Sequence, residues 1–198
     1  MVARMRSMVV ASGVLLLVVG AVGAEAATTR TVVVTDNVFT PAAVSGAQGD
    51  SVKWVNQGNF SHTTTSTITG AVGWNSTLQP TGSFSKALAG AGTYAYHCNF
   101  HAGMSGKVKV RVSVTPASGP VDTKFTVKVA SSAAPTGYAY APQVKVPGSS
   151  SWTSLPTTTA TSVSYVARSA GTYAFRSKVK HGSLAGTAPS PAFSVTVG

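Results

Sequence analysis

The residues best suited to chemistry in this chain surround its only cysteine. Cys98 stands in the run Tyr-His-Cys-Asn-Phe-His-Ala-Gly-Met, with His101 three residues after it and Met104 three residues after that. A further histidine, His62, lies upstream in a Thr-rich segment. One thiolate, two imidazoles and one thioether are the ligand set of a blue-copper electron-transfer site. The residue types and their spacing therefore indicate a site for one copper ion.

Taken singly, each of these residues has a more ordinary explanation. A lone cysteine in an exported protein can be a buried inert thiol or can form an intermolecular bridge. A lone His62 would more often be a surface or capping residue, and a lone Met104 would more often serve packing. It is the occurrence of all of them together, in one order and at short spacing, that favours a metal site.

The elements that must position these side chains are predicted to be β-strands, because apolar residues alternate with polar ones and no helical period appears. Cys98 ends such an alternating run, 92–98, and its neighbours His101 and Met104 follow on a loop. Gly103 and Gly106 are expected to let this loop fold tightly. His62 is expected on a separate loop after the alternating run 51–56.

The alternating runs divide into two all-β domains. The first is expected at 27–114 and the second at 121–198, joined by a linker at 115–120 that contains two prolines. The expected strands are 31–35, 51–56, 92–98 and 107–114 in the first domain, and 124–129, 138–146, 162–167, 171–180 and 192–197 in the second. Short strands punctuated by Gly and Pro at this spacing are typical of β-sandwiches.

The first domain resembles the plastocyanin/azurin family of cupredoxins over residues 32–112. Three segments carry the resemblance: Gly-Asp-Ser-Val-Lys-Trp-Val-Asn at 49–56, Gly-Thr-Tyr-Ala-Tyr-His-Cys at 92–98 and Met-Ser-Gly-Lys-Val at 104–108. The Cys-x-x-His-x-x-Met loop is similar to the short loop of the amicyanin type. The resemblance implies a Greek-key β-sandwich with one type 1 copper, whose ligands are His62, Cys98, His101 and Met104. It also implies that Asn56 ties the two ligand loops together.

The same resemblance implies a single-electron carrier and not an enzyme. A redox partner would dock near His101, on an apolar patch formed by Phe60, Ala102, Gly103 and Trp74. His97, beside the cysteine, is where some copper enzymes carry a ligand to a second copper. The chain has only four histidines, which are too few for a catalytic centre, so His97 is expected to be a partly exposed strand residue.

The second domain resembles a fibronectin type III or other immunoglobulin-like sandwich, for which a spacer or adhesion role is expected. Tyr94 and Tyr173 each begin a strand after a Gly, as in the tyrosine corner of Greek-key sandwiches. Tyr138 and Tyr140 are expected to serve core packing, and glycan binding by them is the less favoured alternative. His181 is expected in a turn.

The N-terminus predicts export. Arg4 and Arg6 precede an apolar stretch at 8–23, and the small residues around Ala26 predict a signal peptide, 1–26, that is cleaved after that alanine. The product is expected in the periplasm, on the cell surface or in the medium, and to be a monomer.

The chain is strongly basic, with a net charge of +11, yet its Lys and Arg residues are scattered along strands. We therefore expect no nucleic-acid binding, and instead association with an acidic redox partner or with anionic polymers of the cell surface. The alternative to an electron carrier is a copper-binding or surface-interaction module without a redox role. A third possibility is a cupredoxin-like scaffold that holds no metal.

Overall fold

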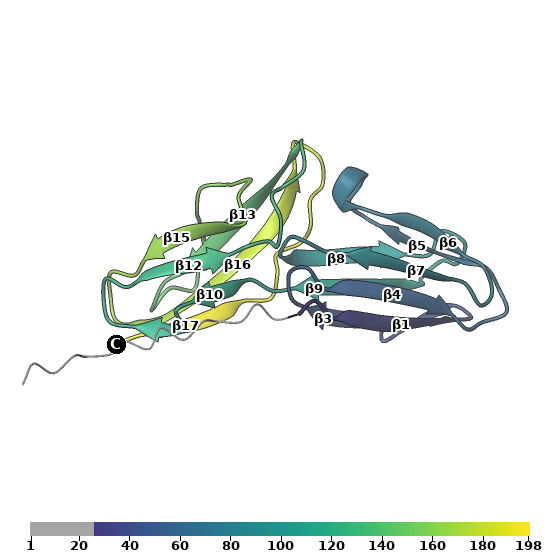
Figure 1. The fold of residues 1–198 in the computed structure, drawn as a ribbon, viewed down its shortest axis with the longest axis horizontal. Coiled ribbons are helices and arrows are strands. Elements are labelled where there is room, and N and C mark those ends of the chain that lie inside the picture. Colours follow the sequence, from purple (N-terminus) through teal and green to yellow (C-terminus); the bar gives the residue numbers. More distant parts are fainter. Residues whose placement is uncertain (1–25) are drawn as a thin grey trace, which may run out of the picture.

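The computed structural model describes residues 26–198, and they form two β-sandwiches that lie end to end (Figure 1). The first sandwich contains β1 (Thr29–Thr35), β2 (Val38–Thr40), β3 (Ala43–Gly46), β4 (Ser51–Asn56), β5 (His62–Ser66), β6 (Asn75–Leu78), β7 (Ser83–Ala87), β8 (Gly92–His97) and β9 (Ser105–Val110). The second contains β10 (Ser113–Thr115), β11 (Ser118–Gly119), β12 (Lys124–Lys128), β13 (Tyr138–Lys145), β14 (Thr153–Ser154), β15 (Ser162–Val166), β16 (Gly171–His181) and β17 (Phe193–Val197). The predicted all-β class is confirmed.

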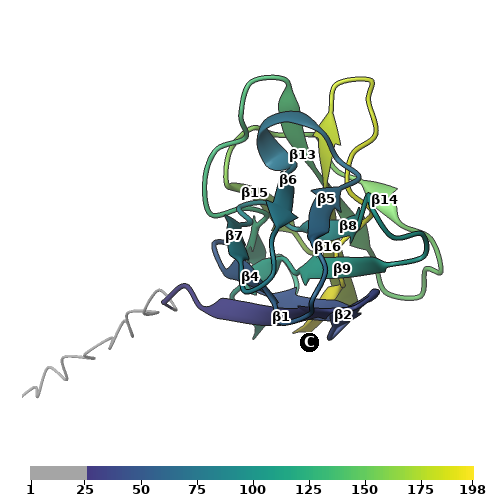
Figure 2. The ribbon, with the colours of Figure 1, turned by 90° about the vertical axis from the view of Figure 1, so that its right-hand side faces the viewer.

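In the first sandwich, one sheet has the order β2-β1-β4-β7 and the other the order β3-β9-β8-β5-β6. Figure 2 views this sandwich from its free end and shows the two sheets as separate layers. The alternation in β4 buries Val52, Trp54 and Asn56 and turns Lys53 to solvent. Trp54 packs against other aromatic rings between the sheets, among them Tyr96, which it meets edge to face. The core thus follows from the period of two in each strand.

The second sandwich pairs a sheet of order β10-β12-β15 with one of order β11-β17-β16-β13-β14. Phe125 from the first of these sheets and Phe175 from the second are fully buried, with ring centroids 6.5 Å apart. The only helical element among residues 26–198 is a 3₁₀ turn at Gly70–Val72. No helix in that range has the length and apolar character needed to cross a membrane.

The junction between the sandwiches differs from the sequence prediction. The expected strand 107–114 is two strands, because β9 pairs with β8 of the first sandwich while β10 pairs with β12 of the second. The expected linker 115–120 is also part of the second sandwich, since β11 pairs with β17. The continuous valine alternation here concealed the change of partner, since a strand's period does not identify its neighbour. The expected signal peptide lies outside the described residues, apart from Ala26.

Both tyrosine corners are confirmed. The Tyr94 hydroxyl donates a hydrogen bond to the carbonyl of Gly90, and the Tyr173 hydroxyl donates one to the carbonyl of Ser169. In each case the acceptor lies four residues upstream, so the corner fixes how the chain enters a central strand. Burial raises the pKa of Tyr94 above its usual range, and the nearby Tyr140 raises it further.

The two sandwiches contact each other through main-chain hydrogen bonds. The Ala91 amide donates to the Val129 carbonyl at 2.8 Å, and Thr93 and Ala188 exchange two bonds, at 2.8 and 3.1 Å. β8 begins at this contact with Gly92 and runs to the opposite end of the first sandwich (Figure 1). The residue that follows β8 is Cys98, so the cysteine lies at the pole remote from the second sandwich.

Candidate metal centre

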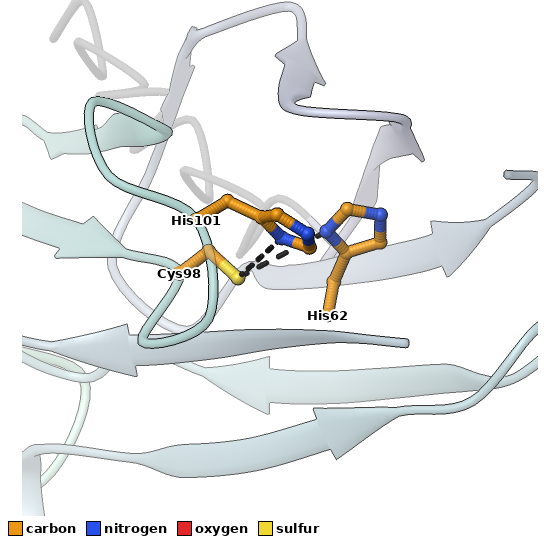
Figure 3. A group of neighbouring side chains, drawn as sticks. All are labelled: His62, Cys98 and His101. Carbon is orange, nitrogen blue, oxygen red and sulfur yellow. Dashed lines mark hydrogen bonds between the residues drawn. The ribbon is translucent and has the colours of Figure 1, made fainter. Parts of the chain in front are cut away.

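Three of the four predicted ligands meet at that remote pole (Figure 3). His62 is the first residue of β5, and Cys98 directly follows β8, which is the neighbour of β5 in the sheet. The Cys98 Sγ lies 3.9 Å from Nδ1 of His62 and 3.5 Å from Nδ1 of His101. One ligand atom from each of the three residues lies within 4.8 Å of the others, and no other such group occurs in residues 26–198.

Met104 closes the loop that carries the other two ligands. Its carbonyl accepts a hydrogen bond from the Cys98 amide at 3.0 Å, and its amide donates to the His101 carbonyl at 3.3 Å. Gly103 has a φ of +80°, a conformation that favours glycine, as expected for a tight loop. The Met104 side chain is buried, so this short loop turns a thioether toward the interior of the sandwich.

Gly106 has a different role from the one expected. A Cβ atom at this position would overlap the ring of Tyr96, its partner across the strand pair. The glycine therefore makes room for an aromatic side chain and does not bend the ligand loop. Tyr96 is in turn packed against Trp54 in the core below the site.

His62 begins a strand and does not lie on the separate loop that the sequence predicted, and the residue that ties this strand to the loop of Cys98 is Thr63. Its hydroxyl accepts a hydrogen bond from the Asn99 amide at 2.7 Å, and its own amide donates to Cys98 Sγ at 3.3 Å. Sequence analysis missed this residue, although its position next to a candidate ligand was a signal. An N–H that donates to the cysteine sulfur is one of the contacts through which a protein tunes a copper–thiolate site.

Asn56 was expected to tie the ligand loops together. This expectation is wrong, because the Asn56 side chain makes its hydrogen bonds elsewhere. Its side-chain nitrogen donates to the carbonyls of Phe60, Leu78 and Gln79, and its oxygen accepts from the Gly58 amide. Asn56 thus shapes the loop that leads to His62 and joins it to the turn between β6 and β7. It makes none of these bonds to the loop after Cys98, since β4 lies in the other sheet.

The surroundings of His62 favour its neutral form. Desolvation lowers the pKa of His62, the nearby His101 lowers it further, and Asp36 opposes both effects. A neutral imidazole with an unprotonated Nδ1 is the form that binds a metal. The other ring nitrogen, Nε2, is buried and has no hydrogen-bond partner. Nδ1 faces Cys98 and is therefore the nitrogen placed to bind a metal.

The surface over the site is apolar. Phe60 and Phe100 are 61% and 58% exposed, and Ala102 and Gly103 are exposed beside the half-buried His101. Trp74, expected in this patch, is instead buried in the core and donates from its indole nitrogen to the Thr64 hydroxyl. We call Phe60, Phe100, Ala102 and Gly103 the apolar rim.

The remaining histidines lie outside the site. His97 is half-buried on β8, and its place in the strand turns it to the opposite face from Cys98. His181 is the last residue of β16, not a turn residue, and its ring stacks on Tyr138 at 4.1 Å. Tyr138 and Tyr140 are both buried, as expected.

The donor set fits copper. Thiolate sulfur and imidazole nitrogen select copper over hard cations such as Mg²⁺ and Ca²⁺, which prefer oxygen. Three of the predicted ligands, His62, Cys98 and His101, converge, and the fourth, Met104, is buried at the end of the same loop as Cys98 and His101. The fold and this cluster define a β-sandwich protein with one copper site.

Comparison with known proteins shows which family the first sandwich is similar to. Residues 27–111 match the copper-binding proteins of the plastocyanin/azurin family. The match ends before the second sandwich, whose kinship with immunoglobulin or fibronectin type III domains stays a prediction. No curated protein sequence matches the chain significantly.

Solved structures similar to the chain include several of amicyanin. A reduced amicyanin variant is 28% identical over 46% of this chain and 87% of its own, with a TM-score of 0.38. A purple cupredoxin from Nitrosopumilus maritimus is 22% identical over 40% of this chain and 97% of its own, with a TM-score of 0.37. A copper-containing nitrite reductase from Thermus scotoductus is 23% identical over 40% of this chain and 21% of its own, with a TM-score of 0.38.

Proposed function

We propose that the protein is an exported electron carrier with one type 1 copper, and that His62, Cys98, His101 and Met104 hold the metal. The observation that carries this proposal is the convergence of two imidazole Nδ1 atoms on the single thiol, Cys98. The sulfur of this thiol also accepts a hydrogen bond from the Thr63 amide. When bound, copper would supply a one-electron couple between Cu(II) and Cu(I).

The chain's own contribution is to hold the ligands still. His62 is fixed in β5, and the bond between the Cys98 amide and the Met104 carbonyl closes the ligand loop. The Thr63–Asn99 bond joins β5 to the ligand loop, so the donor atoms are preorganised in one geometry. A site that does not rearrange when its charge changes has a low barrier to electron transfer.

The apolar rim is the proposed entry point for electrons. His101 reaches the surface there, whereas His62 is fully buried, so the outer edge of the His101 ring gives the shorter route from solvent to the thiolate. A small apolar patch suits the weak, rapidly dissociating contacts of redox partners. A partner protein would therefore dock over Phe60 and Phe100.

Visible absorption of the purified protein with Cu(II) tests the proposal. We expect an intense blue thiolate-to-copper band that disappears in Cys98→Ala, and a reversible couple by cyclic voltammetry. His97→Ala is the matched control, since His97 is adjacent in sequence but faces away, and it should keep the band. A protein that binds copper without this band, or with a band that survives in Cys98→Ala, would contradict the proposal.

The second candidate is a copper-binding module without redox traffic, which the same ligand set would serve. Electrochemistry separates the two functions, because storage or delivery requires no fast couple. An electron carrier should exchange electrons with small inorganic oxidants without releasing copper. A protein that turns blue but loses its copper on reduction would favour the storage module.

A further inference from the structure

The second sandwich presents a face of four cations that the copper site does not use. The strands β13 and β16 are antiparallel neighbours, and alternate residues of each point away from the core. The outward residues include Arg176, Lys178 and Lys180 on β16 and Lys145 on β13. We call these four residues the basic face; the small residues Ala139, Ala141 and Ala174 lie between them in the two strands.

No acid of the described residues balances this face. Residues 26–198 contain three carboxylates, Asp36, Asp50 and Asp122. Asp50 is buried in the first sandwich near Arg30, and Asp36 accepts the Asn59 amide beside the metal centre. Asp122 forms an exposed ion pair with Arg168. An ordinary solvated sheet surface mixes both signs of charge, whereas this one carries a single sign.

One end of the basic face is held in place by an aromatic ring. The Arg176 guanidinium lies 4.1 Å from the centroid of Trp152, and the Lys145 ammonium lies 5.6 Å from the same ring. The Arg176 Nε also donates to the Gln143 side chain at 2.7 Å. These contacts order two of the cations before any ligand arrives, which lowers the entropic cost of binding.

We propose that the basic face binds a linear anionic polysaccharide or polyol, with one carboxylate or phosphate in each repeating unit. Alternate residues of a strand are about 6.7 Å apart, so Arg176, Lys178 and Lys180 form a straight row of regularly spaced cations. A flexible polymer with evenly spaced anions can follow such a row. Its binding would fix the second sandwich to the polymer while the copper site, at the far pole, stays free.

The composition of the face argues against other anionic partners. A folded protein partner needs an apolar centre in its interface, and between these cations the two strands carry only alanines and the polar Gln143. Single-stranded nucleic acid needs free aromatic rings on which bases stack, and Trp152 is engaged by Arg176. The polymer chemistry fits charge and spacing without either feature.

Binding to immobilised polymers tests the proposal with the full chain at about 0.1 M salt. The probes are polygalacturonate for the carboxylate form, poly(glycerol phosphate) for the phosphate form, neutral dextran, and single-stranded oligothymidylate. We expect binding to at least one of the two anionic polymers, and none to dextran. The double variant Lys178→Gln/Lys180→Gln should bind roughly tenfold more weakly. The plot of log binding constant against log salt concentration should be less steep, because about two fewer counterions are released on binding.

The matched control is Lys124→Gln/Lys128→Gln, which removes the same charge from exposed positions on β12 in the other sheet. It should bind nearly as well as the native protein. Equal weakening by both double variants would show a net-charge effect and overturn the proposal, as would binding to neither anionic polymer. Tighter, Lys178- and Lys180-dependent binding to oligothymidylate would overturn it in favour of nucleic acid. The blue band is independent of these outcomes, so failure here leaves the copper function untouched.

Discussion

Thr63 joins the two segments that carry the metal ligands, β5 and the loop after Cys98. Its backbone amide contacts the sulfur of Cys98, while its side-chain hydroxyl holds the amide of Asn99. The first contact belongs to the main chain and survives substitution. The second is lost when the hydroxyl is removed, so the two roles of this residue can be separated by mutation.

Thr63→Val keeps the shape of the side chain but leaves the Asn99 amide without its acceptor. We expect a loss of about 1–2 kcal/mol in the free energy of unfolding, because a partly buried N–H loses its bond. Copper should dissociate faster in competition with a chelator, since the Thr63 hydroxyl no longer joins β5 to the ligand loop. The blue band should change little, because the amide contact to the sulfur remains.

Thr67→Val is the control for this substitution, since Thr67 is exposed. Within residues 26–198 its hydroxyl makes one hydrogen bond, to the Ala95 carbonyl. Chemical denaturation and chelator competition give both readouts. Unchanged stability and copper retention in Thr63→Val would show that water replaces the hydroxyl and that the loops do not depend on it.

At the scale of elements, the buried Asp50 joins the start of the first sandwich to the turn between β3 and β4. Its carboxylate accepts the Thr28 amide at 2.8 Å and the Ala47 amide at 2.9 Å. Burial raises the pKa of Asp50, but these two hydrogen bonds and the nearby Arg30 outweigh that effect and bring it below the usual 3.8. The ionised form therefore stabilises the fold.

This pKa predicts a pH-dependent effect of Asp50→Asn. The folded-state pKa is depressed, so the stabilisation is fully present above about pH 4 and is lost as pH falls through the folded-state value. The native protein should exceed the variant by on the order of 2 kcal/mol at neutral pH, and the difference should shrink on acidification. Urea denaturation at a series of pH values measures it.

Asp122→Asn is the control, because it removes one carboxylate from an exposed ion pair with Arg168. Exposed pairs contribute little to stability, so a much smaller change is expected. A difference between native protein and Asp50→Asn that stays constant from neutral to acidic pH would contradict the role assigned to the ionised carboxylate.

At the scale of the whole molecule, the two sandwiches are in close van der Waals contact at Gly90. Gly90 lies against Tyr140 and Val179 of the second sandwich, and a Cβ atom there would approach them to 2.7 and 2.8 Å. The Tyr138 hydroxyl donates to the Thr69 carbonyl across the same contact. Main-chain hydrogen bonds on both sides of Gly90, from the Ala91 amide to the Val129 carbonyl and from the Ser131 amide to the Ala89 carbonyl, join the two sandwiches.

Gly90→Ala should weaken this contact while leaving each sandwich folded. We expect one unfolding transition in the native protein by scanning calorimetry and two in the variant, because overpacking typically costs about 1–3 kcal/mol at a close contact. The blue band should be unchanged, since the copper site lies at the other pole. A single transition in the variant at the native temperature would contradict tight docking.

Gly148→Ala serves as the control for general strain. Gly148 has a φ of +76° in a loop of the second sandwich, and no atom lies within 4 Å of a Cβ placed there. Alanine in this conformation lowers stability locally by about 1 kcal/mol but does not touch the contact between the sandwiches. It should therefore shift a single transition without splitting it.

Much of this molecule is determined by short stretches of sequence. The loop from Cys98 to Met104 brings its ligands together because seven consecutive residues with a glycine near the end can close on themselves. The strand period likewise fixed in advance that Trp54 and Tyr173 face the interior. These are local properties, and local properties are encoded in adjacent residues.

The tertiary structure decided the remainder. Only the adjacency of β5 and β8 brings His62 to a cysteine 36 positions further along the chain, and the same adjacency gives Thr63 its role. The tertiary structure also pairs β10 with a strand of the second sandwich. It buries Trp74, which was predicted to lie at the surface. The alternation of apolar and polar residues predicts which side of a sheet a residue faces. The strands that become neighbours in the fold determine which side chains it contacts there.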